Sequence, residues 1–157
     1  MWTTFLGLVL LMASPQVEIS KTFKKEMTPL QSGVDSVITS TGSQLLQRSR
    51  AAYIEEYGIV VTLEVAFEGP QNPFSGYKTS AEMRTLVEQR RKDLQEKLTA
   101  FLKQRVSTMD SIAPAESLTI VIHVLNTNPG DVKNLPVQIV MTAKKDSSQP
   151  IAVRVLL

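Results

Sequence analysis

The chain has 157 residues, of which 43% are hydrophobic and 20% charged, with 7 glycines and 8 prolines. This composition excludes a disordered, collagen-like or polytopic membrane protein, and the length fits one compact domain. The net charge of +2, from 17 basic and 15 acidic residues, is too balanced to predict a nucleic-acid partner. Cysteine is absent, which excludes disulfides, thiolate nucleophiles and thiolate zinc sites.

An uncharged apolar run, residues 2–13, lies near the start of the chain and is followed by small and turn-forming residues. This shape is typical of a signal peptide, so residues 1–16 are predicted to be one. A bilayer-spanning helix needs about 20 residues, so no permanent membrane span is expected and a signal anchor is the minor alternative. The charge bias opposes export, because the only nearby cations, Lys21, Lys24 and Lys25, follow the run. A buried intracellular helix is the third interpretation.

The next part of the chain, residues 17–50, has a mixed composition with weak periodicity, and no element is assigned to it. Residues 44–57 fit either a short helix or a strand, and the spacing does not decide between them. Residues 59–68 show the clearest strand pattern, since apolar and polar side chains alternate. The apolar side chains on one face are those of Val61, Leu63, Val65 and Phe67.

The string Tyr53-Ile54-Glu55-Glu56-Tyr57-Gly58 leads directly into this strand. It resembles a Tyr-x-x-Gly-Tyr-Gly lead-in of uncharacterised exported bacterial proteins, with Glu56 where that pattern has glycine. The resemblance covers this short stretch and implies no activity. From the residues themselves, Gly58 is expected to adopt a positive φ or a bulge. Tyr53 and Tyr57 are interpreted as packing residues, with a ligand platform as the alternative.

A long helix follows the glycine- and proline-containing loop of residues 69–78. Thr79 and Glu82 form a capping box, so the helix should begin there and run to about Met109. Glu88 with Lys92, and Asp93 with Lys97, are spaced for ion pairs on its solvated face. The stripe of apolar residues spaced by three and four comprises Met83, Leu86, Val87, Leu94, Leu98, Phe101, Leu102 and Val106.

Three further strands are predicted, over residues 118–125, 137–144 and 151–157, separated by turn-forming residues. The order β-α-β-β-β predicts an α+β domain over residues 51–157, with a mixed sheet of about four strands and one long amphipathic helix packed across it. Val121, Leu125 and Val140 make both faces of two strands apolar. The second face is therefore expected to be partly covered, by residues 17–50 or by another subunit.

The residues that carry chemistry are few. Glu55, Glu56, Glu64 and Glu68 are the only local carboxylate cluster, and Glu64 and Glu68 are about 13 Å apart on one face of an extended strand, too far for an acid/base pair. They are interpreted as exterior charges, and no metal site is predicted. The lone histidine, His123, has no nucleophile or carboxylate beside it in sequence and is interpreted as a surface residue.

No catalytic residue and no cofactor are predicted. The candidate partner-binding residues are aromatic: Tyr53 and Tyr57, and Phe74 and Tyr77 on the loop of residues 69–78. We expect a non-catalytic binding or accessory module, periplasmic or secreted, with a protein partner in the cell envelope favoured over a small molecule and a homo-oligomer through the exposed sheet face as a further option. The alternatives are an enzyme using carboxylates in a cleft near this loop and an intracellular nucleic-acid binder through the basic helix.

Overall fold

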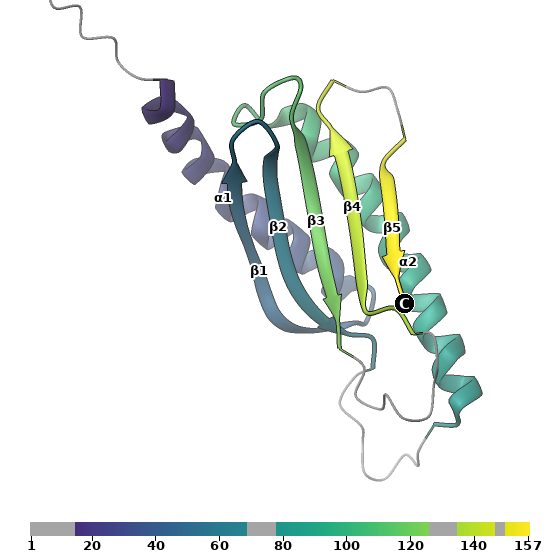
Figure 1. Ribbon diagram of the computed structural model, residues 1–157. Helices are drawn as coiled ribbons and strands as arrows, with labels where there is room; N and C mark the ends of the chain where they lie inside the picture. Colours follow the sequence, from purple (N-terminus) through teal and green to yellow (C-terminus); the bar gives the residue numbers. More distant parts are fainter. Residues whose placement is uncertain (1–14, 69–77, 126–134, 147–149) are drawn as a thin grey trace, which may run out of the picture.

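The computed structural model describes residues 15–68, 78–125, 135–146 and 150–157. They form two helices and a five-stranded mixed sheet, which confirms the α+β class (Figure 1). The strands lie side by side in chain order; β2 and β3 are parallel and every other neighbouring pair is antiparallel, which gives the mixed sheet that the sequence predicts. In chain order the elements are α1 (Pro15–Ser40), β1 (Gln44–Ile54), β2 (Gly58–Ala66), α2 (Ser80–Thr108), β3 (Ser117–Val124), β4 (Gln138–Lys144) and β5 (Ala152–Leu156).

The segment to which the sequence assigned no element, residues 17–50, contributes most of α1 and the first part of β1. Helix α1 buries one stripe, with its apolar residues three and four positions apart: Met27, Leu30, Val34 and Ile38. Residues 44–57, which fitted either a helix or a strand, contain strand β1, which extends from Gln44 to Ile54. The sheet thus has one more strand, and the domain one more helix, than expected.

Strand β1 is an irregular edge strand whose register against β2 shifts twice, between Leu45 and Gln47 and between Gln47 and Arg50. Ser49 lies inside the second shift and is bound to α1. Its backbone N–H donates to Asp35 Oδ1 at 3.0 Å and its hydroxyl donates to the Gln31 carbonyl at 3.1 Å. The Gln31 side-chain amide donates in return to the Ser49 carbonyl at 3.2 Å. These hydrogen bonds hold α1 against the edge strand β1.

The turn between β1 and β2 uses backbone conformations that suit glycine. Gly58 has φ 109°, and a Cβ there would lie 2.1 Å from the carbonyl oxygen of Ser117 on the neighbouring strand β3. The expected positive φ at Gly58 is therefore confirmed. Glu56 also has a positive φ, 65°, at the position where the resembling pattern has glycine.

Helix α2 begins with the predicted capping box, since the Thr79 hydroxyl accepts from the Glu82 N–H and the Glu82 carboxylate accepts from the Thr79 N–H. These bonds lower the pKa of Glu82. The helix packs over β3 and β4, while α1 packs over β1 and against α2. Lys97, expected to pair with Asp93, instead donates to the Ser40 carbonyl at the end of α1, at 2.9 Å.

The hydrophobic core lies on one side of the sheet, between the strands and both helices (Figure 1). It unites the inward residues of β2, such as Leu63, with Leu98 of α2 and Leu30 of α1, each at most 1% exposed. The expectation that residues 17–50 cover the second face is wrong. Their helix belongs to the same layer as α2, because its apolar stripe is needed to fill the core over β1. The other face, here called the open face, is not covered by any described helix or strand.

The connection from α2 to β3, residues 109–116, is held by two side chains from other parts of the chain. Glu26 of α1 accepts from the N–H groups of Asp110 and Ser111, at 2.8 and 3.2 Å. Lys145, just after β4, donates to the carbonyls of Met109 and Ile112, both at 2.7 Å. These bonds pair the backbone groups left open where α2 ends, and so fix where β3 enters the sheet beside β2.

Candidate partner-binding surface

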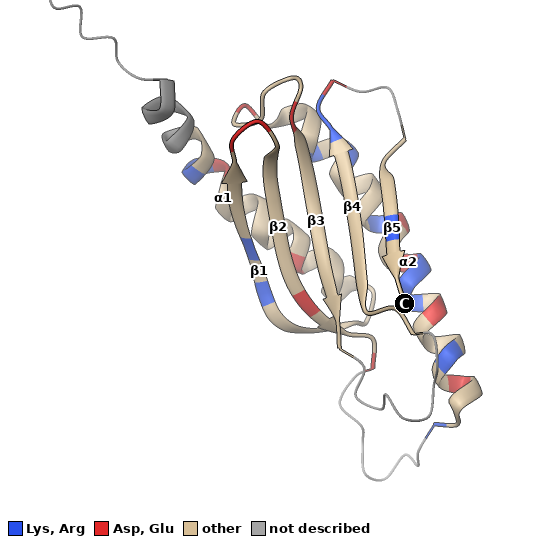
Figure 2. Ribbon diagram, viewed as in Figure 1, with Lys and Arg blue, Asp and Glu red and all other residues tan. Residues whose placement is uncertain are grey.

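A straight row of side chains crosses the open face from one edge of the sheet to the other. Its members are cross-strand neighbours, in order Arg50, Thr62, Val121, Val140 and Arg154. With strands about 4.8 Å apart, the Cα atoms of the two arginines are about 19 Å apart. Figure 2 shows the blue of Lys and Arg on both edge strands, while the middle stretches of β3 and β4 between them are uncharged. This row, here called the arginine row, therefore has cationic ends and an uncharged, β-branched centre.

The adjacent row consists of small and β-branched residues, in order Ala52, Val60, Thr119, Thr142 and Ala152. Thr119 is only 2% exposed although it lies on the open face. Its hydroxyl is 3.1 Å from the Tyr57 hydroxyl and 3.0 Å from the Thr142 hydroxyl. Tyr57, itself 45% exposed, thus lies against this row and contributes an aromatic side chain to the open face.

A third row lies on the other side of the arginine row and contains two ionisable residues on inner strands, Glu64 and His123. It runs Gln47, Glu64, His123, Gln138 and Leu156. His123 is exposed on the face opposite the core, as predicted, between Glu64 on β2 and Gln138 on β4. Within the described ranges, no group of three or more metal-ligating side chains comes together. Glu64 is the one acidic residue among these three rows.

The structure places the two tyrosines of the candidate set on opposite sides of the sheet. Tyr53 faces the helices, where its hydroxyl donates to Glu116 Oε1 at 2.6 Å and its ring meets Phe23 edge-on, with centroids 6.3 Å apart. The hydrogen bond to the Glu116 carboxylate raises the pKa of Tyr53 to about 12. Tyr57 faces the open side, so it is the tyrosine that a partner on that side can reach. Phe74 and Tyr77 lie outside the described residues.

The carboxylates named from the sequence also separate. Glu64 stays half-buried on the open face, whereas Glu68 is only 6% exposed. The interpretation of Glu68 as an exterior charge is wrong, because β2 ends at Ala66 and the strand alternation no longer governs the residues beyond it. Glu55 and Glu56 lie at the opposite end of β2, in the turn after β1.

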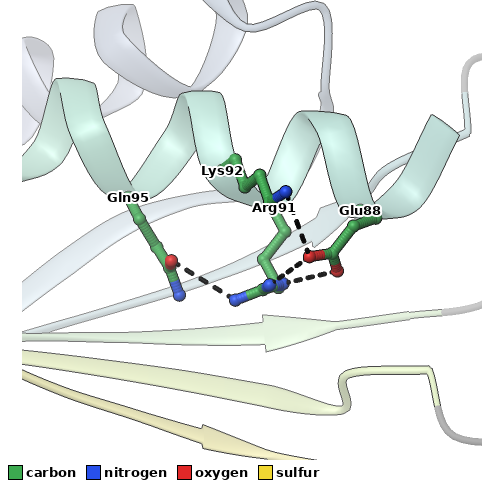
Figure 3. A network of polar contacts seen from close by, with 4 residues as sticks. All are labelled: Glu88, Arg91, Lys92 and Gln95. Atoms are coloured by element: carbon green, nitrogen blue, oxygen red, sulfur yellow. Dashed lines mark hydrogen bonds and ion pairs between the residues drawn. The ribbon is translucent and has the colours of Figure 1, made fainter. Parts of the chain in front are cut away.

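Helix α2 carries a polar network on its flank, shown in Figure 3. Arg91 binds Glu88 through two nitrogens, at 2.5 and 3.0 Å, and reaches the Gln95 side-chain oxygen at 3.3 Å. The expected pair of Glu88 with Lys92 is present at 3.9 Å. The hydrogen bonds from Arg91 lower the pKa of Glu88. Cations and anions thus lie close together on this helix, whereas in the row from Arg50 to Arg154 the cations lie only at the two ends.

The arginine row is the feature that sequence reasoning missed. Arg50 lies in a segment for which no strand was assigned, and Arg154 lies on a strand predicted without a register. Alternation along β3 and β4 does identify Val121 and Val140 as residues of the outer face. Only the cross-strand register shows that the two arginines flank them.

No protein-family model, curated protein or solved structure matches this chain. Neither of the described helices is long and apolar enough to serve as a membrane span.

Proposed function

We propose that the protein is a non-catalytic binding module that receives a protein partner on the open face of its sheet. The observation that carries this proposal is the row from Arg50 to Arg154, which presents an uncharged centre of Thr62, Val121 and Val140 between two cations. The centre suits the apolar core of an interface, and the arginines suit its rim. A complementary partner would present small apolar side chains with carboxylates on either side.

The shape of this surface supports a protein partner over a small molecule. The described open face is one layer of five paired strands about 19 Å wide, and its side chains are mostly short. Small-molecule sites are usually concave and enclose most of their ligand, whereas protein interfaces are commonly broad and nearly flat. Tyr57, exposed and held in place by Thr119, adds the kind of aromatic anchor that is enriched in such interfaces.

The proposed setting is the periplasm or cell envelope of a bacterium. This part of the proposal rests on the apolar residues 2–13, which lie outside the described residues, and on the resemblance of residues 53–58. An accessory role in an envelope assembly is consistent with a domain that offers a broad surface.

Two lysines placed in the centre of the open face test the proposal. In the double variant Val121→Lys, Val140→Lys, both charges stand on half-buried open-face positions, where a lysine can keep its stem on the sheet and its ammonium in water. The matched control is Thr85→Lys, Gln89→Lys, on the exposed side of α2. The tagged proteins would be used to capture partners from envelope extract of the host.

We expect the open-face variant to capture at least tenfold less partner than the parent, because a lysine buried at an interface must be desolvated. Its thermal midpoint should not change. The α2 control should capture as the parent does. Equal capture by all three proteins would show that the open face is not the binding surface.

A further inference from the structure

The two edges of the sheet differ in how they are protected against pairing with another strand. The β1 edge carries two register shifts, and the Ser49 N–H and C=O inside it are bonded to Asp35 and Gln31 of α1. Bulges and coverage of this kind are the usual means by which proteins block an edge strand. The β1 edge is therefore closed to a further strand near its centre.

Among the residues that the structure describes, the β5 edge has none of these features. Its register with β4 is unbroken from Gln138 opposite Leu156 to Thr142 opposite Ala152. Strand β5 contains no proline, glycine or lysine. Alternate residues of an antiparallel edge strand direct their N–H and C=O groups away from the sheet, and in the described part of the chain no side chain hydrogen-bonds to these groups. The backbone of β5 is thus open to a strand on its free side.

The side chains along this edge are apolar and exposed. Val153 is 44% exposed, Leu156 46% and Leu157 72%. Val153 lies on the helix side of the sheet and Leu156 on the open face. Helix α2 packs over β3 and β4, which leaves the helix-side residue Val153 incompletely covered. A strand that joined β5 would bury apolar surface on both faces in addition to satisfying backbone groups.

We propose that the occupant of this edge is a second copy of the chain, with the two β5 strands paired antiparallel about a two-fold axis at Val155. In this register Val153 lies opposite Leu157 of the second copy, and Arg154 lies opposite Leu156 of the second copy. Each of the exposed apolar residues then gains an apolar or aliphatic neighbour across the axis.

The alternative registers are less favourable. Centring the axis on Arg154 would set two arginines directly opposite each other, and like charges in that position are destabilising. Centring it on Val153 would leave Leu156 and Leu157, the two most exposed apolar residues of this edge, without a partner in the opposing β5. Of the three registers compared, only the one centred on Val155 both separates the arginines and gives Val153, Leu156 and Leu157 apolar or aliphatic neighbours. The resulting dimer is isologous and has a continuous ten-stranded sheet.

This inference is independent of the proposed function, because edge pairing leaves the open face of each copy uncovered. A short edge interface is small, so the dimer is expected to be concentration-dependent. Sedimentation velocity of the full chain over a broad concentration range should show the mass rising from 17.4 kDa toward twice that value.

Single cysteines give the sharpest test, because the chain has none of its own. In Val155→Cys the two sulfurs would face each other across the axis, with Cα atoms about 5.5 Å apart, within the range of a disulfide. The matched control is Ala152→Cys, whose Cα atoms in the same register would be separated by six residues along the strand, about 20 Å. Under mild oxidation, the first variant should form a covalent dimer and the second should stay monomeric.

A second test of the dimer introduces a charge at the two-fold axis. Val155→Lys places two ammonium groups at the axis and should raise the dimer dissociation constant at least tenfold, while Leu46→Lys on β1 should not change it. Circular dichroism would verify that the lysine variant folds. If it does not fold, the smaller change Val155→Cys still tests the proposal. A chain that remains monomeric up to millimolar concentration, a dimer that withstands a folded Val155→Lys variant, or preferential cross-linking at Ala152→Cys would overturn the proposal.

Discussion

The turn before β2 shows how individual residues set the backbone of this fold. At Gly58 the close approach of the Ser117 carbonyl and a φ of 109° exclude any side chain. At Glu56 the backbone has φ 65°, a conformation that costs a residue with a Cβ about 1 to 2 kcal/mol but costs glycine nothing. The two positions together turn the chain from β1 into β2, and one of them is occupied by a residue poorly suited to it.

Replacing Glu56 with glycine is therefore expected to stabilise the protein. The gain in free energy of unfolding should be up to about 1 kcal/mol, since the relieved strain is partly offset by the greater freedom of glycine in the unfolded chain. Urea melts of Glu56→Gly and of the control Glu55→Gly, whose φ is not positive, would measure it. The control should lose stability. A loss of stability in both variants would contradict the assigned strain.

Tyr53 provides a second prediction at this scale. Its pKa is raised to about 12 by the bond to Glu116, so the neutral phenol is favoured in the folded state. The stability contributed by this bond is full below pH 10, the ordinary pKa of tyrosine, and is lost as the pH rises through 12. Spectrophotometric titration should show a late phenolate transition that Tyr53→Phe removes.

The same substitution should lower the free energy of unfolding at neutral pH by about 1 to 2 kcal/mol, because Glu116 loses one of its donors and keeps the other, the N–H of Ala113. Tyr57→Phe serves as the control, since the Tyr57 hydroxyl contacts a neutral threonine on the open face. If the phenolate transition that Tyr53→Phe removes lay near pH 10, the ordinary pKa of tyrosine, Tyr53 would not bind a carboxylate in solution.

At the scale of the element, α2 and β2 to β5 could be predicted because each follows one simple period. The Thr79 and Glu82 capping box gives the start of α2, and alternation gives the inward residues of β2 and β3. Helix α1 could not be assigned, since Pro29 interrupts its pattern and serine and threonine are frequent toward its end. Strand β1 could not be separated from a helix, because its two register shifts break the alternation on which the prediction depends.

Leu98 tests the core that these elements form. It is 0% exposed between α2 and the sheet. Leu98→Ala should lower the free energy of unfolding by about 2 to 5 kcal/mol, because it removes buried methyl groups and leaves a cavity. Denaturant melts give the value, with Gln104→Ala on the exposed side of α2 as the control. A loss below about 1 kcal/mol would show that the stripe of α2 does not face the core.

At the scale of the whole molecule, the fold is one sheet with two unlike faces. Both helices lie on one of them, and the cross-strand register assembles the row from Arg50 to Arg154 on the other. The sequence indicates which residues of β3 and β4 face outward. It does not indicate the row, because a row depends on which strands are neighbours and how they are aligned, and one of its ends lies on the strand that could not be assigned.

The open face is proposed to receive a protein partner. A photo-cross-linking amino acid placed at Val121, in the middle of the arginine row, tests it in living cells of the host. The matched probe is placed at Thr85 on the exposed side of α2. Val121 should yield, upon irradiation, a discrete adduct with another envelope protein, and Thr85 should yield none. No adduct at Val121, or the same adducts at both positions, would show that the open face is not the partner-binding surface.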